Sequence, residues 1–230
     1  MYYSQFILNC KDIYTLFTLI NHTSECTFTI FIMKSKDNIS TQRQKENPTR
    51  FFDPDEWEKF IYNCNLKWRP YFWIMMLTGL RHNEASNISD KDIDTKNKWI
   101  VILKAKGGRT RIRYVHLSSY ALKFIKNFVK ENNMSNNNTR FNFPTRQGMR
   151  QYMHEICKQQ NIKGWNDFST HNLRKTHENY LLTLNKDSMK VATHMGHTSK
   201  TALDHYVSSA FIKDKKQLDK IREWLGDIFE

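Results

Sequence analysis

The sequence has few cysteines and no long uninterrupted apolar run. The four cysteines form no CxxC pair, which argues against both a zinc site and a disulfide framework. Lys11 and Asp12 interrupt the apolar N-terminal stretch, so no run reaches the ~18 residues that a membrane-spanning helix needs. No signal peptide and no internal repeat are recognisable. These absences favour a cytoplasmic protein in a reducing setting, with no membrane partner.

Acidic residues are also fewer than basic residues. The chain of 230 residues has 23 Asp and Glu against 36 Lys and Arg, which gives a net charge of +13. This balance favours a polyanionic partner, although many basic proteins bind no nucleic acid. The chain is 13% aromatic and 39% hydrophobic, which argues against wholesale disorder and allows one or two domains with a packed core.

Composition divides the chain into four parts: a short N-terminal segment (1–34), a polar linker (35–50), a main domain (51–212) and an amphipathic C-terminal helix (213–230). The main domain is predicted to be mainly α-helical with a small antiparallel β-sheet. Asp53, Pro54 and Glu56 are typical of a helix start, and Ser118 can cap a second helix. Further helices are predicted to end near Gly79 and to span 81–87, 145–158, 171–184, 187–195, 199–207 and 214–229.

A basic β-hairpin is predicted in the middle of the chain. Residues 99–103 and 109–117 have strand-like composition, and Gly107-Gly108 can form the turn between them. Two sets of side chains alternate along RIRYVHL: Ile112, Tyr114 and His116, and Arg111, Arg113 and Val115. The alternation predicts a hairpin with one basic side.

Six spaced residues form the pattern that carries chemistry. They are Arg81 in TGLRHNE, Lys106 in KAKGGRTR, His171 and Arg174 in STHNLRKT, and His197 and Tyr206 in HMGHTSKTALDHY. Forked guanidinium groups match phosphate oxygens, and a lysine can protonate a leaving alcohol. A histidine can take a proton, and a tyrosine can attack phosphorus. Together they are a plausible set for metal-free phosphoryl transfer on a DNA backbone.

This set resembles the tyrosine recombinase, or phage integrase, family over about residues 50–210. The six family positions occur in order, with 23 residues from Arg174 to His197 and nine from His197 to Tyr206. Met195 stands where the family's LGH box has leucine. The resemblance implies the tyrosine-recombinase catalytic-domain fold. It also implies an integrase of a mobile element that cleaves and rejoins double-stranded DNA through a 3′-phosphotyrosyl intermediate, without metal, other cofactor or ATP.

The resemblance implies that four of these residues grip the scissile phosphate. Arg81 and Arg174 would clamp its non-bridging oxygens, and Glu84 would support Arg81. His171 would transfer a proton or contact the phosphate, and His197 would hydrogen-bond to it.

The remaining two positions would make and break bonds. Tyr206 is the implied nucleophile, and Asp204 and His205 are alternatives only if the register is shifted. Lys106 is the implied general acid for the leaving 5′-hydroxyl, with Lys104 as the competing assignment. The expected DNA-binding neighbours are Lys104, Arg109, Arg111, Arg113 and Lys175.

Other interpretations of the chain stay open. Each motif alone has an ordinary explanation as a surface ion pair, a solvated hairpin, a helix start or a packed tyrosine. The whole pattern also fits a type IB topoisomerase, or a catalytically silent DNA-binding protein derived from a recombinase. Residues 1–47 are shorter than the core-binding domain that family members usually carry, so the chain is a catalytic module, a truncated relic or dependent on another chain. The C-terminal helix either docks on a neighbouring protomer, giving oligomers on DNA, or packs on its own domain.

Overall fold

A computed structural model describes residues 50–103, 112–132, 134, 140–184, 186–197 and 212–230. The chain divides into two units, Met1–Gln44 and Lys45–Glu230, and all described residues belong to the second unit. The predicted N-terminal segment and almost all of the predicted linker therefore lie outside the described residues.

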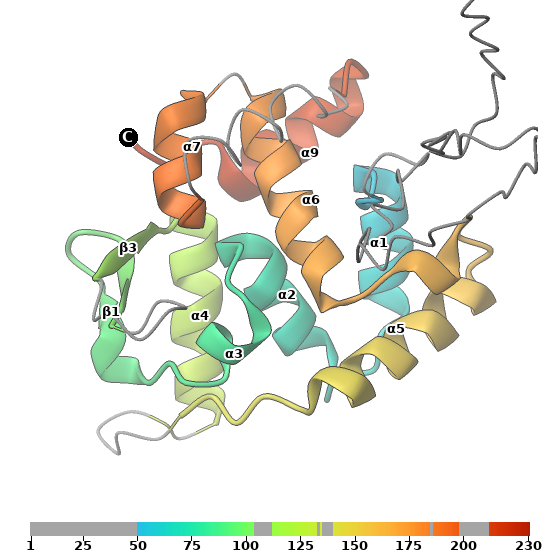
Figure 1. The fold of residues 1–230 in the computed structure, drawn as a ribbon, viewed down its shortest axis with the longest axis horizontal. Helices are drawn as coiled ribbons and strands as arrows, with labels where there is room; N and C mark the ends of the chain where they lie inside the picture. Colours follow the sequence, from blue (N-terminus) through green and yellow to red (C-terminus); the bar gives the residue numbers. More distant parts are fainter. Residues whose placement is uncertain (1–49, 104–111, 133, 135–139, 185, 198–211) are drawn as a thin grey trace, which may run out of the picture. The chain divides into compact units, whose positions relative to one another are not determined.

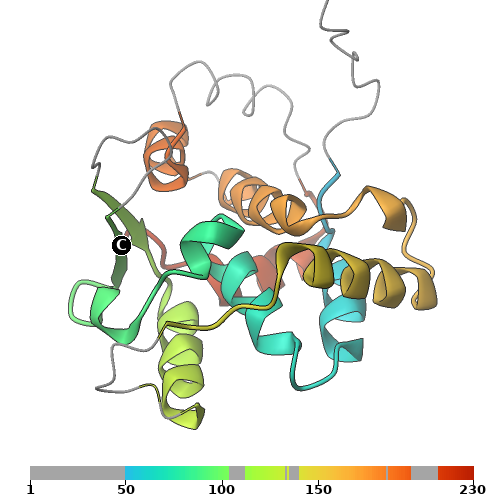
Figure 2. The same cartoon turned by 60° about the horizontal axis from the view of Figure 1, so that its bottom comes forward.

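Helices make up most of the described structure (Figure 1). They are α1 (Pro54–Asn63), α2 (Arg69–Thr78), α3 (His82–Ala85), α4 (Ser119–Glu131), α5 (Arg146–Gln159), α6 (Thr170–Thr183), α7 (Ser188–Met195) and α9 (Lys215–Leu225), with short 3-10 turns at Asp90–Asp92 and Trp165–Asp167. Helix α2 is buried from Phe72 to Thr78 and packs against α4 and α6, which makes it the centre of the core (Figure 2). The predicted helices agree with these bounds to within a few residues, and the largest difference is at α9, which ends at Leu225 rather than at 229. The helix expected at 199–207 lies outside the described residues.

The helix ends follow the local signals in the sequence. The backbone N–H of Asp53 donates to the Glu56 carboxylate at 3.2 Å, and Pro54 is the first residue of α1. The hydroxyl of Ser118 accepts from the Ala121 N–H at 3.0 Å and so caps α4. Gly79 and Gly196 end α2 and α7 with φ of 63° and 65°, the left-handed conformation in which a side chain is unfavourable. These predicted boundaries are confirmed.

A small antiparallel sheet lies beside α7 and contains both strands of the predicted hairpin, whose turn at Gly107-Gly108 lies outside the described residues. Its strands are β1 (Ile93–Asp94), β2 (Trp99–Ile102) and β3 (Arg113–His116), in the order β1-β2-β3, and Trp99 pairs with His116. The alternation along β3 is confirmed, since Arg113 and Val115 are buried while Tyr114 is exposed. The side that was predicted to be basic therefore faces the interior at Arg113, because Glu84 supplies a buried counter-charge there.

The C-terminal helix α9 packs on its own unit, against α1, α4 and α6. Ile221, Trp224 and Leu225 are buried in this contact. At its edge the Lys220 ammonium pairs with Asp55 at 2.8 Å and also with Glu58. The structure thus realises the second of the two predicted arrangements, and docking on another protomer stays a prediction. No helix in the described ranges is both long and apolar enough to cross a membrane.

Candidate active site

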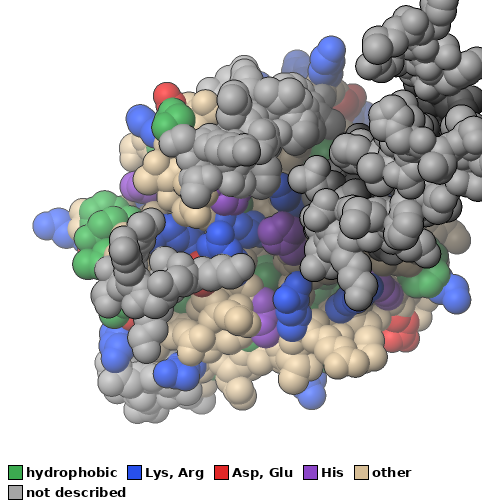
Figure 3. Space-filling model, viewed as in Figure 1, with side chains coloured by type: hydrophobic (Ala, Val, Ile, Leu, Met, Phe, Trp, Pro, Cys, Tyr) green, Lys and Arg blue, Asp and Glu red, His purple; other side chains and the backbone are tan. Residues whose placement is uncertain are grey.

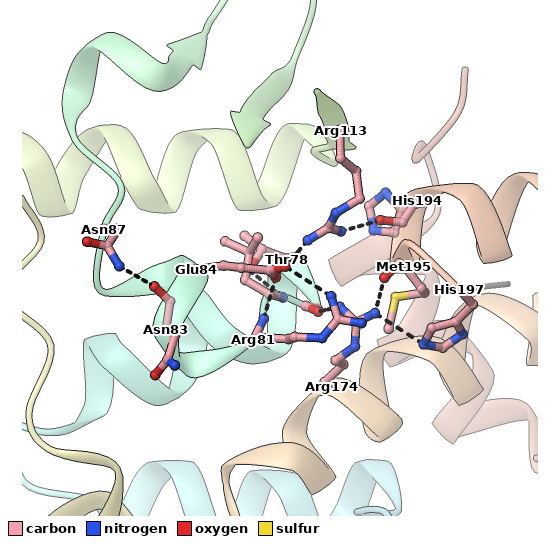
Figure 4. Close-up of polar contacts among 12 residues, drawn as sticks. Thr78, Arg81, Asn83, Glu84, Asn87, Arg113, Arg174, His194, Met195 and His197 are labelled. Carbon is pink, nitrogen blue, oxygen red and sulfur yellow. Dashed lines mark hydrogen bonds and ion pairs between the residues drawn. The ribbon is translucent and has the colours of Figure 1, made fainter. Parts of the chain in front are cut away.

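Basic side chains gather on the face that carries α3, the start of α6 and the end of α7 (Figure 3). Figure 4 shows three guanidinium groups, those of Arg81, Arg113 and Arg174, directed toward one another from α3, β3 and α6. Glu84 and His197 complete the group. Segments that are far apart in the sequence therefore meet here and bring Arg81, Arg174 and His197 together.

Arg174 is the most buried cation of the site, with 2% of its surface exposed. Its Nη1 donates to the carbonyl of Gly79 at 2.6 Å, and its Nη2 donates to the carbonyl of Met195. Both carbonyls lie at helix C-termini, where the helix dipole favours a positive charge. Burial first, and then the positive charges of Arg81 and Arg113, lower the pKa of Arg174 to about 9. The group stays cationic at neutral pH, and an arriving anion would stabilise it.

Glu84 joins the other two arginines. Its Oε1 accepts from Arg81 Nη1 at 3.0 Å, and its Oε2 accepts from Arg113 Nη2 at 2.6 Å. Oε2 also accepts from the backbone N–H of Arg81 at 2.8 Å, which fixes the start of α3. Burial alone raises the pKa of Glu84, but the charges of Arg113 and Arg81 outweigh it and the net pKa is lowered. The carboxylate is therefore ionised and holds Arg81 in place.

His197 lies between Arg174 and a buried carboxylate. Its Nε2 is 3.1 Å from Arg174 Nη2, so this nitrogen is the acceptor in the observed contact. Its Nδ1 lies 3.1 Å from Oε1 of Glu178, at ion-pair distance. Glu178 also lies 3.9 Å from the ammonium of Lys175. The carboxylate can stabilise a positive charge on the imidazole when Nε2 turns from acceptor to donor.

His171 occupies the first turn of α6, three residues before Arg174, and its side chain reaches the surface. Partial burial first, and then the charges of Lys175, Arg174 and Arg81, lower its pKa to about 4. The imidazole is therefore neutral at physiological pH, with one ring nitrogen able to accept a hydrogen bond.

Residues 50–212 match the model of the phage integrase family. The chain belongs to this family. The match covers most of the chain and includes every candidate catalytic position. It confirms the family that the six-residue pattern resembled.

Two curated relatives of this phage-integrase chain illustrate the range of similarity. The probable integrase/recombinase of Acholeplasma phage L2 is 33% identical over 90 residues, which cover 36% of this chain and 30% of the relative. Tyrosine recombinase XerC of Staphylococcus aureus strain JH9 is 26% identical over 182 residues, which cover 73% of this chain and 59% of XerC. The chain thus spans less than two thirds of either relative.

Solved structures confirm the predicted fold. The Tn1549 transposon integrase in complex with transposon right-end DNA has a TM-score of 0.58 at 18% identity, over 79% of this chain and 67% of that one. XerA recombinase has a TM-score of 0.56 at 16% identity, over 77% of this chain and 65% of that one. XerH bound to a palindromic difH substrate has a TM-score of 0.56 at 21% identity, over 76% of this chain and 52% of that one. At these identities the likeness is one of fold.

Several predicted site residues lie outside the described residues. They are Lys104, Lys106, Arg109, Arg111, Asp204, His205 and Tyr206. The structure therefore brings together Arg81, Arg174 and His197 with Glu84, and places His171 and Lys175 on the same helix as Arg174. Within the described part of the chain, no group of three or more His, Cys, Asp or Glu side chains is placed to hold a metal ion.

Two features of this phage-integrase site belong to no sequence motif. The first is Glu178, which is mid-helix and belongs to no motif, although its position four residues after Arg174 indicates a shared helix face. The second is a buried imidazole pair, in which Nε2 of His177 lies 2.9 Å from Nε2 of His194. His177 is fully buried on α6, and no local sequence signal indicates its partner on α7.

Hydrogen bonds assign the tautomers of this pair. The N–H of His116 donates to Nδ1 of His194 at 3.2 Å, so His194 carries its proton on Nε2 and donates to His177. The Nδ1–H of His177 then donates to the carbonyl of Met76 at 2.9 Å. This chain of bonds joins β3, α7, α6 and α2. Both imidazoles are neutral, which keeps further positive charge away from the site.

Proposed function

We propose that the protein is a site-specific DNA recombinase or integrase that cleaves and rejoins DNA through a 3′-phosphotyrosyl intermediate. The observation that carries this proposal is the convergence of Arg81, Arg174 and His197 from three separate elements. The names of relatives support a DNA substrate, since XerC is a tyrosine recombinase and a XerH structure is a post-cleavage complex with difH.

The charges of the site suit a phosphodiester, which carries one negative charge. Among the described side chains, the cations of Arg81, Arg113, Arg174 and Lys175 outnumber the carboxylates of Glu84 and Glu178. A phosphate placed against Arg81 and Arg174 would offset part of the remaining positive charge. The same arginines would stabilise the negative charge that builds on the equatorial oxygens in the transition state.

The proposed reaction exchanges one phosphodiester bond for another. The Tyr206 phenol, with an ordinary pKa of ~10, gives up its proton as its oxygen bonds to phosphorus. His171, three residues before Arg174 on α6, is the candidate acceptor for this proton. The bond from phosphorus to the 5′ oxygen breaks, and Lys106 protonates that oxygen. A 5′-hydroxyl from another strand reverses these steps, so bond energy is conserved and no ATP is needed.

The decisive experiment is a covalent-adduct assay on duplexes that are nicked near the cleavage position. The duplexes carry the DNA that flanks the gene, alongside a pool of randomised sequence. Wild-type protein should give a protein–DNA band that survives SDS, and Tyr206→Phe should give none while still binding the duplex. An adduct formed by Tyr206→Phe would assign the nucleophile elsewhere, with Asp204 and His205 tested next.

Two other functions predict different results in the same assay. A catalytically silent DNA-binding protein shifts the duplex in a gel but gives no SDS-resistant band with any substrate. A type IB topoisomerase forms the adduct but relaxes supercoiled DNA without joining two different duplexes. Joining of a cleaved strand to a second duplex supports the recombinase.

A further inference from the structure

Arg113 is a buried arginine that the candidate mechanism does not use. Only 9% of its surface is exposed, and its side chain reaches from β3 toward Glu84 and the end of α7 (Figure 4). From these contacts we infer that Arg113 is a positioning residue, which sets Arg81 and the end of α7 around the scissile phosphate without touching the DNA. The inference rests on the proposed strand cleavage.

The guanidinium of Arg113 joins two parts of the site. Its Nη2 donates to Oε2 of Glu84 at 2.6 Å, while the other oxygen of that carboxylate holds the guanidinium of Arg81. Its Nη1 donates to the backbone carbonyl of His194 at 2.5 Å. A charged, two-sided contact of this kind fixes the distance between the start of α3 and the end of α7.

The contact with α7 has a second arginine beside it. Arg113 binds the carbonyl of His194, and Arg174 binds the next carbonyl along the chain, that of Met195. The last carbonyls of a helix have no partner within the helix, so these two arginines supply the missing donors. His197 follows two residues later. Its direction therefore depends on how firmly both carbonyls are held.

Gly196 shows how closely the Arg113 side chain fits. A Cβ atom at this position would lie 2.9 Å from Cδ of Arg113, too close for an unstrained contact. The glycine thus has two reasons to be present, its positive φ and the room that Arg113 needs. Both the aliphatic stem and the guanidinium of Arg113 are held in place. The side chain therefore has little freedom to turn outward toward DNA.

The test compares single-turnover cleavage with DNA binding. The variant Arg113→Met keeps the aliphatic stem and loses the charge. We expect its cleavage rate to fall by about 10- to 100-fold, because misplaced catalytic groups slow reactions on this scale. The dissociation constant for DNA and its salt dependence should stay unchanged. Arg222→Met is the matched control, since Arg222 is an exposed arginine of α9 that pairs with Asp219. It should cleave at the wild-type rate.

A double variant separates positioning from general loss of structure. If Arg113 acts through Glu84, the rate loss in Arg113→Met with Glu84→Gln should be clearly smaller than the product of the two single losses. If Arg113 only supported the fold, Arg113→Met would lower the melting temperature, and its loss of cleavage rate would multiply with that of Glu84→Gln. This result would overturn the inference. Arg113→Lys keeps a positive charge but cannot reach both acceptors, and serves as the main variant if Arg113→Met does not fold.

The remaining outcomes are also distinct. If wild-type protein forms no adduct, the proposed function fails, and the inference fails with it. If wild-type cleaves and Arg113→Met cleaves equally fast, only the inference fails. If Arg113→Met weakens binding and lowers the salt slope by about one, Arg113 contacts a phosphate directly, as the sequence had suggested, and the inference is overturned.

Discussion

Acid should destabilise this protein through the buried pair of His177 and His194. Burial is the main cause that lowers the pKa of His177 to about 3 and the pKa of His194 well below its ordinary value of 6.5. In the unfolded chain both imidazoles bind protons below about pH 6.5. The unfolded state therefore binds more protons than the folded state between about pH 3 and 6.5, and stability falls as the pH falls through this window.

The expected loss of stability follows from the number of protons that the unfolded chain binds and the folded protein does not. Each histidine that stays neutral in the folded state contributes roughly 1 kcal/mol of lost stability per pH unit below 6.5. The pair should therefore lower the free energy of unfolding by about 4 kcal/mol between pH 6.5 and 4.5. This is a large part of the 5–15 kcal/mol that is typical of a folded domain.

The assay is urea unfolding, followed by circular dichroism, at several pH values from 7.5 to 4.5. The double variant His177→Phe with His194→Leu removes both titrating groups and keeps an apolar contact. It should start less stable at pH 7.5, because the His116 N–H and the Met76 carbonyl lose their partners. Its stability should nevertheless fall less steeply with acid than that of the wild type. Parallel curves for the two proteins would refute the reasoning.

Three further predictions concern the site itself. Arg174→Ala should slow strand cleavage by at least ~10²-fold, the usual loss for a transition-state donor, and a wild-type rate would remove Arg174 from the site. Glu178→Gln should slow cleavage and move the pH–rate profile, because the carboxylate next to His197 loses its charge; an unchanged profile would show that Glu178 only packs. Gly79→Ala should lower the free energy of unfolding by at least ~1 kcal/mol, since φ is 63° and the new Cβ would lie 2.5 Å from the His177 ring. A melting curve that matches the wild type would contradict this account.

The sequence predicted those features of the fold that depend on a few neighbouring residues. Asp53 with Glu56, Ser118, Gly79 and Gly196 mark helix boundaries, because caps and positive φ angles are satisfied within one turn. The Arg81–Glu84 contact was predictable for the same reason, as it spans three residues of one helix start.

The structure changed the interpretation of the hairpin. Alternation along RIRYVHL correctly divided the side chains between two faces, but charge suggested that the arginine face was the outer one. Arg113 is buried because Glu84 and the end of α7 together supply acceptors for its guanidinium. Those acceptors lie 29 and 81 residues away in the sequence, so no local pattern could reveal them.

The sequence by itself determined the family, the helical character of the main domain and the order of the candidate catalytic residues, because motif spacing and helix ends are short-range properties. Only the tertiary structure decided that Arg81, Arg174 and His197 share one site, that Arg113 contacts Glu84 and Glu178 contacts His197, and that His177 pairs with His194. The physical reason is the same in each case. Whether a charged or polar side chain is exposed or buried depends on partners that folding brings from distant parts of the chain.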